Sequence, residues 1–268
     1  MSKYYLRSLW VGGNYFDLIY QLIRRDIEAK YRGSLFGIFW SLLNPFLYLG
    51  VYFLIFTYFF PSRSSNQGDN SSFILSLFLG LIVFNFFSDC INRSPTLITS
   101  NPNYVKKVVF PLELLVFVSI GSAFYNLIIG FIAWFLMYFC IYGEINWVIM
   151  LAPIIVLPLC LFILGFSWFF SALGVYIRDI VQIMPPLTQM LMFLSPIFYN
   201  LNQAPKWAKQ LILLNPLSFV IEQERLVLIG GSAPEILGFI LYISIGLIFA
   251  SAGLWFFKVA RPGFADVI

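Results

Sequence analysis

Six long apolar segments limit what this chain can fold into. A helix needs about 20 mostly apolar residues to cross the hydrocarbon core of a bilayer, and six stretches of the sequence meet this requirement. They are residues 35–60, 73–98, 108–142, 147–177, 180–200 and 236–257. Charged residues make up only 10% of the chain, against about 25% in an average soluble domain. We therefore expect an all-α fold: a polytopic membrane protein with six transmembrane helices.

The segments between the spans indicate how the chain is oriented. Cytoplasmic loops of membrane proteins carry an excess of Lys and Arg. An even number of spans puts both ends of the chain on one side, and that side holds eleven Lys and Arg residues against four on the other. We therefore expect both termini to lie in the cytoplasm. We expect no cleavable signal peptide, because the first apolar run begins at residue 35 and is too long.

Residues 15–32 are predicted to form an amphipathic helix ahead of the first span. Apolar residues such as Leu18 and Leu22 share one face, while Arg24 and Arg25 point elsewhere. A basic amphipathic helix beside a span lies in the cytoplasmic interface, either as a plain anchor or as a docking surface for a cytoplasmic partner. We therefore divide the chain into a cytoplasmic segment, 1–34, which contains this helix, and a six-helix transmembrane domain, 35–268.

The external segment 201–235, between the fifth and sixth spans, is too apolar for a solvated loop. Each of its halves has only about 10–13 residues, which is too short to cross a bilayer. We expect two half-helices that meet at Asn215-Pro216 and lie in a re-entrant or interfacial position. They form either an amphipathic lid or a gate at the outer mouth of a pathway. The candidate gate residues are Trp207, Asn215, Pro216, Glu222 and Arg225.

The residue types present exclude several kinds of chemistry. The sequence has no histidine, and Cys90, Cys140 and Cys160 are too far apart for a zinc or iron–sulfur motif. No lysine is followed by Ser or Thr, so the sequence lacks a phosphate-binding loop. The spans carry few ionisable groups, which argues against ion-driven transport; Asp89 and Arg93 are expected to pair along one helix. We therefore expect no metal, no cofactor and no enzymatic activity, with any ATP hydrolysed by a separate subunit.

Aromatic and polar residues recur every four positions in the first span. This stripe consists of Phe36, Trp40, Asn44, Tyr48, Tyr52 and Phe56. Tyr and Trp have polar tips that prefer water or interfaces to bare lipid. Composition alone favours ordinary helix packing for the stripe. The alternative is a pathway for glycans, because sugars pack their apolar faces on aromatic rings.

Several motifs occur together along the chain and carry a family resemblance. The run LIRRDIEAKYRGSLFGIFWSLLNP at 22–45 closely resembles the opening of type-2 ABC-exporter permeases. These are the polysaccharide exporters of the O-antigen (Wzm-like), capsule and teichoic-acid systems. Residues 101–111 are similar to their first cytoplasmic loop, and 176–179, 194–199 and 215–217 match further motifs of the family. The resemblance covers essentially the whole chain, in order.

This resemblance implies a half-transporter of the bacterial inner membrane. Two copies of the chain would form the channel, and two ATP-binding subunits, which hold ATP and Mg, would dock beneath it. The substrate would be a polysaccharide on an undecaprenyl-type lipid, with no nucleic acid involved. The residues implied in coupling to the ATPase are Arg24, Arg25, Lys106, Lys107, Arg178 and Asp179. The implied channel lining is Phe36, Trp40, Tyr48, Tyr52, Phe56, Phe193 and Tyr199, and the implied gate helices lie within 204–231.

Other functions share parts of this pattern. More distant permeases of the same type export drugs or small lipids. A membrane glycosyltransferase or ligase needs a carboxylate constellation or a metal site, and the acid-x-acid pairs Asp26/Glu28 and Glu222/Glu224 have no convincing partners. A passive scramblase or channel works without an ATPase. Among these, we expect a permease for an O-antigen-like glycan.

Overall fold

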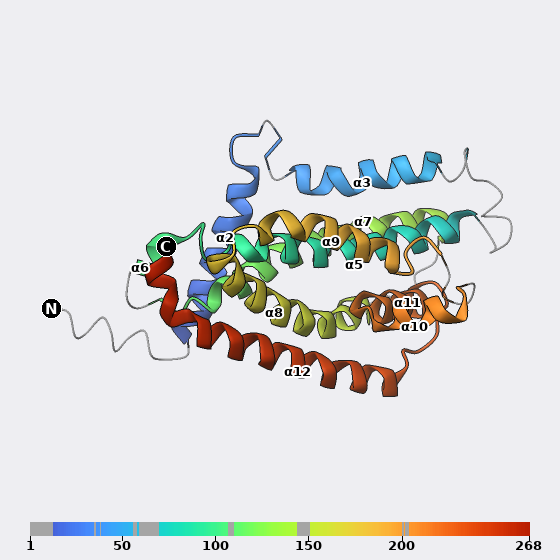
Figure 1. Ribbon diagram of the computed structural model, residues 1–268. Coiled ribbons are helices and arrows are strands. Elements are labelled where there is room, and N and C mark those ends of the chain that lie inside the picture. Colours follow the sequence, from blue (N-terminus) through green and yellow to red (C-terminus); the bar gives the residue numbers. More distant parts are fainter. Residues whose placement is uncertain are drawn as a thin grey trace.

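Every regular element is a helix in the part of the chain that the computed structural model describes (Figure 1). That part comprises residues 13–34, 36–37, 39–55, 58, 70–106, 110–143, 151–199, 201 and 204–268. The longer helices are α2 (Gly13–Tyr31), α3 (Phe39–Leu54), α5 (Asn70–Arg93), α7 (Leu114–Tyr142), α8 (Ala152–Tyr176), α9 (Ile180–Leu194) and α12 (Ile236–Ala260). The shorter ones are η2 (Ser94–Thr96), α6 (Pro102–Lys106), α10 (Lys206–Leu214), α11 (Pro216–Leu228), η5 (Arg261–Gly263) and α13 (Phe264–Val267). The prediction of an all-α fold is confirmed.

Four segments of the structure are long and apolar enough to cross a bilayer. They are Ser71–Thr96, Leu114–Tyr142, Ala152–Tyr176 and Ile236–Val267, and each overlaps one predicted span. The helices in the other two predicted spans are shorter, since α3 has 16 residues and α9 has 15, or about 24 and 22 Å of helix. α9 ends where Ser195 becomes extended before a proline. Residues 56–57 and 59–60 of the first predicted span lie outside the described residues, so the count of six spans stays a prediction.

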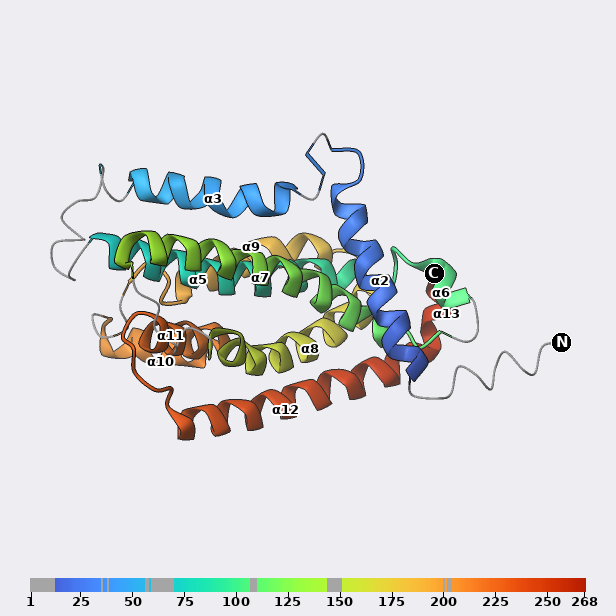
Figure 2. The same cartoon turned by 180° about the vertical axis from the view of Figure 1, so that it is seen from behind.

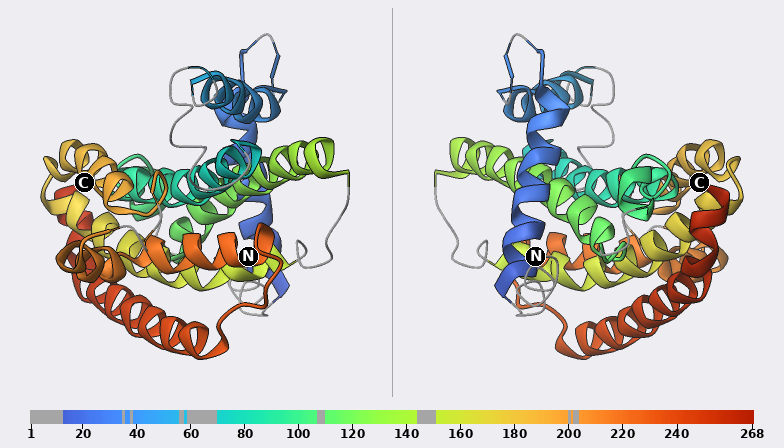
Figure 3. Two further views of the ribbon diagram at one scale, coloured as in Figure 1. Left: turned by 90° about the vertical axis from the view of Figure 1, so that its right-hand side faces the viewer. Right: turned by 90° about the vertical axis from the view of Figure 1, so that its left-hand side faces the viewer.

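The long helices run side by side, and the remaining elements gather at the two ends of the bundle. α5, α7 and α8 lie centrally, α12 packs along α8 on one outer side, and α3 lies beside α7 on the opposite side (Figures 1 and 3). α2 crosses one end of the bundle at a steep angle, and α6 and the C-terminal α13 lie at that same end (Figure 2). α10 and α11 lie at the other end. The predicted interface helix and the predicted gate helices are therefore at opposite ends.

α5 is the most enclosed of the four long helices. Of its most apolar 18-residue stretch, 78% is buried, against 17% for α12. The buried apolar side chains of α5 belong to one core that also includes residues of α7, α8, α9 and α11. The indole Nε1 of the buried Trp134 on α7 donates a hydrogen bond to the carbonyl oxygen of Leu75 at 2.9 Å. α5 is thus the helix around which α7, α8, α9 and α11 pack.

Two glycines allow α8 and α12 to approach each other closely. A Cβ at Gly165 on α8 would lie 2.5 Å from the carbonyl oxygen of Phe249, and a Cβ at Gly253 on α12 would clash with the backbone of Gly165. Small residues at helix contacts favour association in membranes, because association there depends on van der Waals packing. This close contact attaches α12 to the rest of the bundle.

We expect Gly165→Ala to lower the thermal midpoint of the purified protein in detergent, because the added methyl group must push α12 away from α8. Overpacking of this kind costs about 1–3 kcal/mol. Gly50→Ala is the matched control, since a Cβ at Gly50 on α3 would meet no atom within 4 Å. Scanning fluorimetry of both variants measures the difference, and equal midpoints would contradict the close contact.

Candidate functional site

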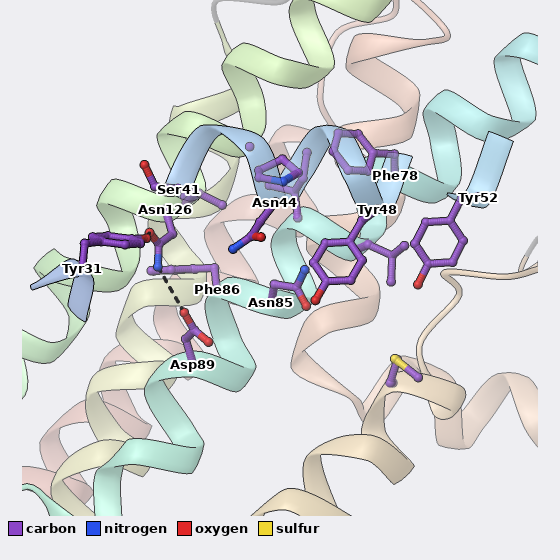
Figure 4. A pocket seen from close by; sticks show the side chains of 16 residues that line it. Tyr31, Ser41, Asn44, Tyr48, Tyr52, Phe78, Asn85, Phe86, Asp89 and Asn126 are labelled. Carbon is purple, nitrogen blue, oxygen red and sulfur yellow. Dashed lines mark hydrogen bonds between the residues drawn. The ribbon is translucent and has the colours of Figure 1, made fainter. Parts of the chain in front are cut away.

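A polar cleft of about 420 Å³ lies between α3, α5 and α7 (Figure 4). The polar side chains that line it are Tyr31, Ser41, Asn44, Tyr48, Tyr52, Asn85, Asp89 and Asn126. Polar residues within transmembrane segments normally face a protein interior or a water-filled cavity, and they often mark substrate pathways. Here such residues from several helices surround one space. The cleft is therefore the leading candidate for a functional site.

The C-terminal part of α5 carries a polar stripe, and two of its residues, Asn85 and Asp89, line the cleft. The stripe consists of Asn85, Ser88, Asp89, Asn92 and Arg93. Asn92 donates to the Ser88 hydroxyl at 2.9 Å and accepts from Thr188 of α9 at 3.2 Å. Asp89 accepts a hydrogen bond from Asn126 of α7 at 3.3 Å (dashed line in Figure 4). The stripe therefore links α5 to two neighbouring helices by hydrogen bonds.

Two ion pairs join α2 to the C-terminal end of the stripe. The two terminal nitrogens of Arg93 donate to the two Asp26 carboxylate oxygens, both at 2.9 Å, and Nη1 also lies 3.1 Å from the Ser122 hydroxyl. Lys30 Nζ lies 3.6 Å from Asp89 Oδ2. The partners on each helix are four residues apart, so they lie on successive turns. Two turns of α2 thus match two turns of α5 with opposite charges.

The expected pairing of Asp89 with Arg93 along one helix is wrong. Each residue pairs with α2 instead, because that helix crosses the end of the bundle and brings an opposite charge to both. A pair within one helix gains about 0.2–0.5 kcal/mol. The bidentate contact of Arg93 with a carboxylate is stronger, since both hydrogen bonds involve charged groups. The four-residue spacing in the sequence identified only the partner on the same helix. Nothing in the sequence indicated that α2 crosses the end of the bundle at this point.

The Asp26 carboxyl stays ionised in this pair. Burial raises its pKa, but the hydrogen bonds from Arg93 and Ser122 and the charges of Arg93 and Lys30 together outweigh burial, so the pKa of Asp26 lies below its ordinary value. The contact between α2 and α5 is therefore retained into the acidic range.

Two of the predicted channel residues line the cleft. The rings of Tyr48 and Tyr52 point into it from α3 (Figure 4). Phe36 and Trp40 contact each other edge to face, with ring centroids 5.7 Å apart. Neither is among the described residues that line the cleft. Phe56 lies outside the described residues. A channel role for these residues stays a prediction.

The other two predicted channel residues lie together at the C-terminal end of α9. Phe193 is exposed, and the Tyr199 hydroxyl donates to its backbone carbonyl at 3.3 Å. Tyr199 and the predicted gate residue Trp207 line a separate hollow of about 400 Å³, which is mostly apolar. The structure therefore associates Tyr199 with α10 and not with the cleft.

The predicted coupling residues that the structure describes are all exposed. They are Arg24, Arg25, Lys106, Arg178 and Asp179. Their elements, namely α2, α6 and the turn between α8 and α9, lie at the same end of the bundle (Figures 1 and 2). Arg24 is held by Glu28, four residues further along, at 2.9 Å. Lys107 lies outside the described residues, and a coupling role for the group stays a prediction.

α10 and α11 meet at Asn215, where the sequence predicts the junction of two half-helices. The Asn215 side-chain oxygen accepts from the N–H of Leu217 at 3.0 Å, and Pro216 occupies the first helical position. The Asn215 amide donates to the Ser195 hydroxyl at 2.8 Å, and the Tyr242 hydroxyl donates to the Pro216 carbonyl at 2.5 Å. The junction is therefore fixed to the end of α9 and to α12. Whether the two helices are re-entrant or interfacial stays a prediction.

Arg225 ties α11 to the segment that follows α9. Its guanidinium lies 3.3 Å from the Glu222 carboxylate and donates to the carbonyls of Ile197 at 2.8 Å and Tyr199 at 3.2 Å. These two predicted gate residues therefore form one contact with each other and with that segment.

Glu224, which the sequence presents only as part of the acid-x-acid pair Glu222/Glu224, is a further candidate. It is completely buried, and within the described residues neither of its carboxylate oxygens has a hydrogen-bond partner. Burial raises the pKa of the Glu224 carboxyl well above its ordinary value. The sequence does contain a feature that could have predicted this burial. Val220 and Leu228 lie four residues to either side of Glu224, on the same face of α11, and both are apolar and buried.

The chain is similar to known proteins along nearly its whole length. The family described as ABC-2 type transporter matches residues 17–229. The chain is 27% identical over 259 residues to the O-antigen export system permease protein RfbA of Klebsiella pneumoniae, covering 96% of each chain. It is also 27% identical over 259 residues to the protein of the same name from Myxococcus xanthus, covering 95% of this chain and 96% of that one. It is 28% identical over 227 residues to the polysialic acid transport protein KpsM of Escherichia coli, covering 80% of this chain and 82% of that one.

We expect Asp26→Asn and Arg93→Gln each to lower the thermal midpoint, because each leaves a partly buried charged group without its partner, at a cost of about 1–3 kcal/mol. The double variant should lose less than the sum of the two. Because the pKa of Asp26 is lowered in the folded protein, its contribution is present at neutral pH and is lost as the pH falls below about 4. Arg24→Gln/Glu28→Gln is the control, since that pair is exposed on the same helix. Strict additivity of the two single changes would argue against the ion pair.

Glu224→Gln should raise the thermal midpoint at neutral pH, and the gain should shrink at acidic pH. The pKa of Glu224 is raised in the folded protein, so ionisation opposes folding increasingly as the pH rises above the ordinary value of a Glu carboxyl. The glutamine has no such ionisation and nearly the same shape. Midpoints measured from about pH 4 to pH 9 test this, with Glu28→Gln on the exposed face of α2 as control. A pH-independent difference would show that Glu224 is not buried as an acid.

Proposed function

This chain belongs to the ABC-2 type transporter family, and from that premise we propose that it is the permease subunit of an ABC transporter that exports an O-antigen-like polysaccharide on an undecaprenyl-type lipid. The observation that carries the proposal is the similarity, along nearly the full chain, to two permeases named for O-antigen export. In this proposal the chain itself is not an enzyme. A separate ATP-binding subunit binds ATP and Mg and supplies the energy.

In the proposed arrangement the chain crosses the bacterial inner membrane six times, with α3 and α9 as the two shorter spans. The end of the bundle that carries α2, α6 and α13 faces the cytoplasm, together with both termini. The excess of Lys and Arg in the segments assigned to that side supports this orientation. α10 and α11 then lie at the outer face, where they form the proposed gate.

The transporter contains two copies of this chain in our proposal. α9 exposes Gln182 and Gln189, which are seven residues apart and so share one face of the helix. Amide side chains are costly in hydrocarbon unless another helix or water satisfies them. α9 also borders the cleft through Met192. A second copy against this side of the molecule satisfies the exposed amides and encloses the cleft within a pathway.

The cleft provides the glycan with aromatic rings and amide groups. Tyr48 and Tyr52 offer flat apolar surfaces to the faces of sugar rings, while Asn44, Asn85 and Asn126 both donate and accept hydrogen bonds. The whole cleft is only about 420 Å³, so it holds a few sugar units at a time. A polymer must keep moving, and many weak contacts of this kind suit movement better than one deep binding site.

The ATP-binding subunit acts on the cleft through α2 and α5. In this proposal the subunit contacts the exposed coupling residues on α2, at Lys106 of α6 and in the turn at Arg178 and Asp179. A displacement of α2 then reaches α5 through the Asp26–Arg93 and Lys30–Asp89 pairs. α5 carries Arg93 and Asp89, which pair with α2. It also lines the cleft, through Asn85 and Asp89.

Export from cells tests this function. Cells that lack the chain should lose their surface polysaccharide, and the unchanged chain should restore it. We expect Tyr48→Ala/Tyr52→Ala to restore several-fold less, with each single change milder, since the stacking of a nucleic-acid base on one ring is worth about 1–3 kcal/mol and a sugar gains less. Phe46→Ala/Phe53→Ala is the matched control, because these rings are exposed on α3 and do not line the cleft.

The yield of purified complex is measured alongside the surface polysaccharide. A parallel fall in both, or an equal loss in the control, would show that the two tyrosines pack the protein and do not line the pathway. Unchanged surface polysaccharide in cells without the chain would overturn the function itself.

A further inference from the structure

We propose that the cleft selects uncharged glycans and rejects polyanionic ones. This inference rests on the proposed function and names the chemical class of its substrate. The two kinds of relative make the distinction concrete, because some are named for O-antigen export and one for the transport of polysialic acid, a polymer of an acidic sugar. Overall similarity does not separate these substrates, whereas the charges in the cleft do.

The cleft has no cation available for an anionic polymer. Among the described residues that line it, Asp89 carries the only formal charge, and that charge is negative. The nearest basic groups are already engaged: Lys30 lies 3.6 Å from the Asp89 carboxylate, and Arg93 makes its bidentate contact with Asp26. The balance of charge at the cleft is therefore neutral to negative.

The other helices around the cleft add no cation, and the predicted gate residue Arg225 on α11 is engaged by Glu222 and by two backbone carbonyls. The sequences of α3, α7, α8 and α9 contain no Lys or Arg at all. Pores that conduct anions or phosphates are lined by Arg and Lys side chains, because a charge that leaves water is stabilised only by an opposite charge or by several hydrogen bonds. A chain with one carboxylate on every sugar would find no opposite charge here, and only a few amide and phenol donors for all of its carboxylates.

The groups that are present suit hydroxyl groups. Asn44, Asn85 and Asn126 each have two N–H donors and a carbonyl acceptor, and a sugar hydroxyl both donates and accepts. Asp89 is an acceptor, so it also binds hydroxyl groups and repels carboxylates. The rings of Tyr48 and Tyr52 contact the sugar faces without regard to charge. Recognition by this set therefore favours a hydroxyl-rich, uncharged chain.

A binding experiment with two matched probes tests the inference. The full chain, purified with its ATP-binding subunit, is placed in nanodiscs of uncharged lipid. The probes are an oligogalacturonate of defined length and the same oligosaccharide after reduction of its carboxyl groups, each with the same uncharged fluorophore. They differ only at one carbon of each sugar, which carries a carboxylate in the first probe and a hydroxymethyl group in the second. We expect the reduced probe to bind at least about tenfold more tightly, because like charges brought together in a binding site are costly.

Two isosteric changes on α5 should shift this preference in opposite directions. Asp89→Asn removes the acid and releases Lys30, so the ratio between the two probes should fall by several-fold. Asn85→Asp places a second acid in the cleft, one turn before the first, and should increase the ratio. A variant that merely unfolds would lose both probes together, which its thermal midpoint reveals. Opposite shifts from two changes of equal size are specific to the charge of the cleft.

Three results would overturn the inference: equal or tighter binding of the acidic probe, no shift or a common shift in the two variants, or no binding of either probe. None of these depends on whether the chain exports polysaccharide in cells, which is measured separately by loss of the surface polymer. The substrate class and the transport function therefore stand or fall on different experiments.

Discussion

A polar group on a lipid-embedded helix needs a partner within the protein, because hydrocarbon offers none. α5 is subject to this constraint near its C-terminal end, and three neighbouring helices supply the partners. Arg93 is paired with α2, Asp89 with α2 and α7, and Asn92 with α9. The helix that forms the centre of the apolar core thus also determines where three of its neighbours lie. The cleft opens at the next turn, where the stripe faces α3.

This arrangement gives α5 two roles in the protein. The C-terminal end of α5 is joined to α2 through Arg93 and Asp89, and Asp89 also lines the cleft together with Asn85, one turn earlier. A buried helix transmits displacement along its length, because close packing leaves its side chains little room to move. The proposed coupling therefore requires no change of secondary structure between the interface helix and the proposed pathway.

The local features of this fold could be predicted from the sequence, but the contacts between segments that are far apart in the sequence could not. Long apolar runs indicate helices directly, Asn215-Pro216 carries its own capping chemistry, and the four-residue spacing of Tyr48 and Tyr52 puts both rings on one face. The partners of Asp89 and Arg93 depend on where α2 crosses the bundle, and no spacing rule contains that information. The same holds for Asn126, which reaches the cleft from α7, and for Glu224, whose burial depends on the face that α11 presents to the core.

α3 differs from the other long helices because very little of it is buried in the core. None of its described apolar side chains is fully buried, and Tyr52 is the one that packs against the main core. The helix that supplies Tyr48 and Tyr52 to the cleft therefore contributes little to the stability of the fold. Substitutions along α3 are therefore expected to change the size and shape of the cleft while the folded bundle persists. The cleft is thus bounded by rings of α3 on which the fold depends little and by polar groups of α5 that also hold the bundle together.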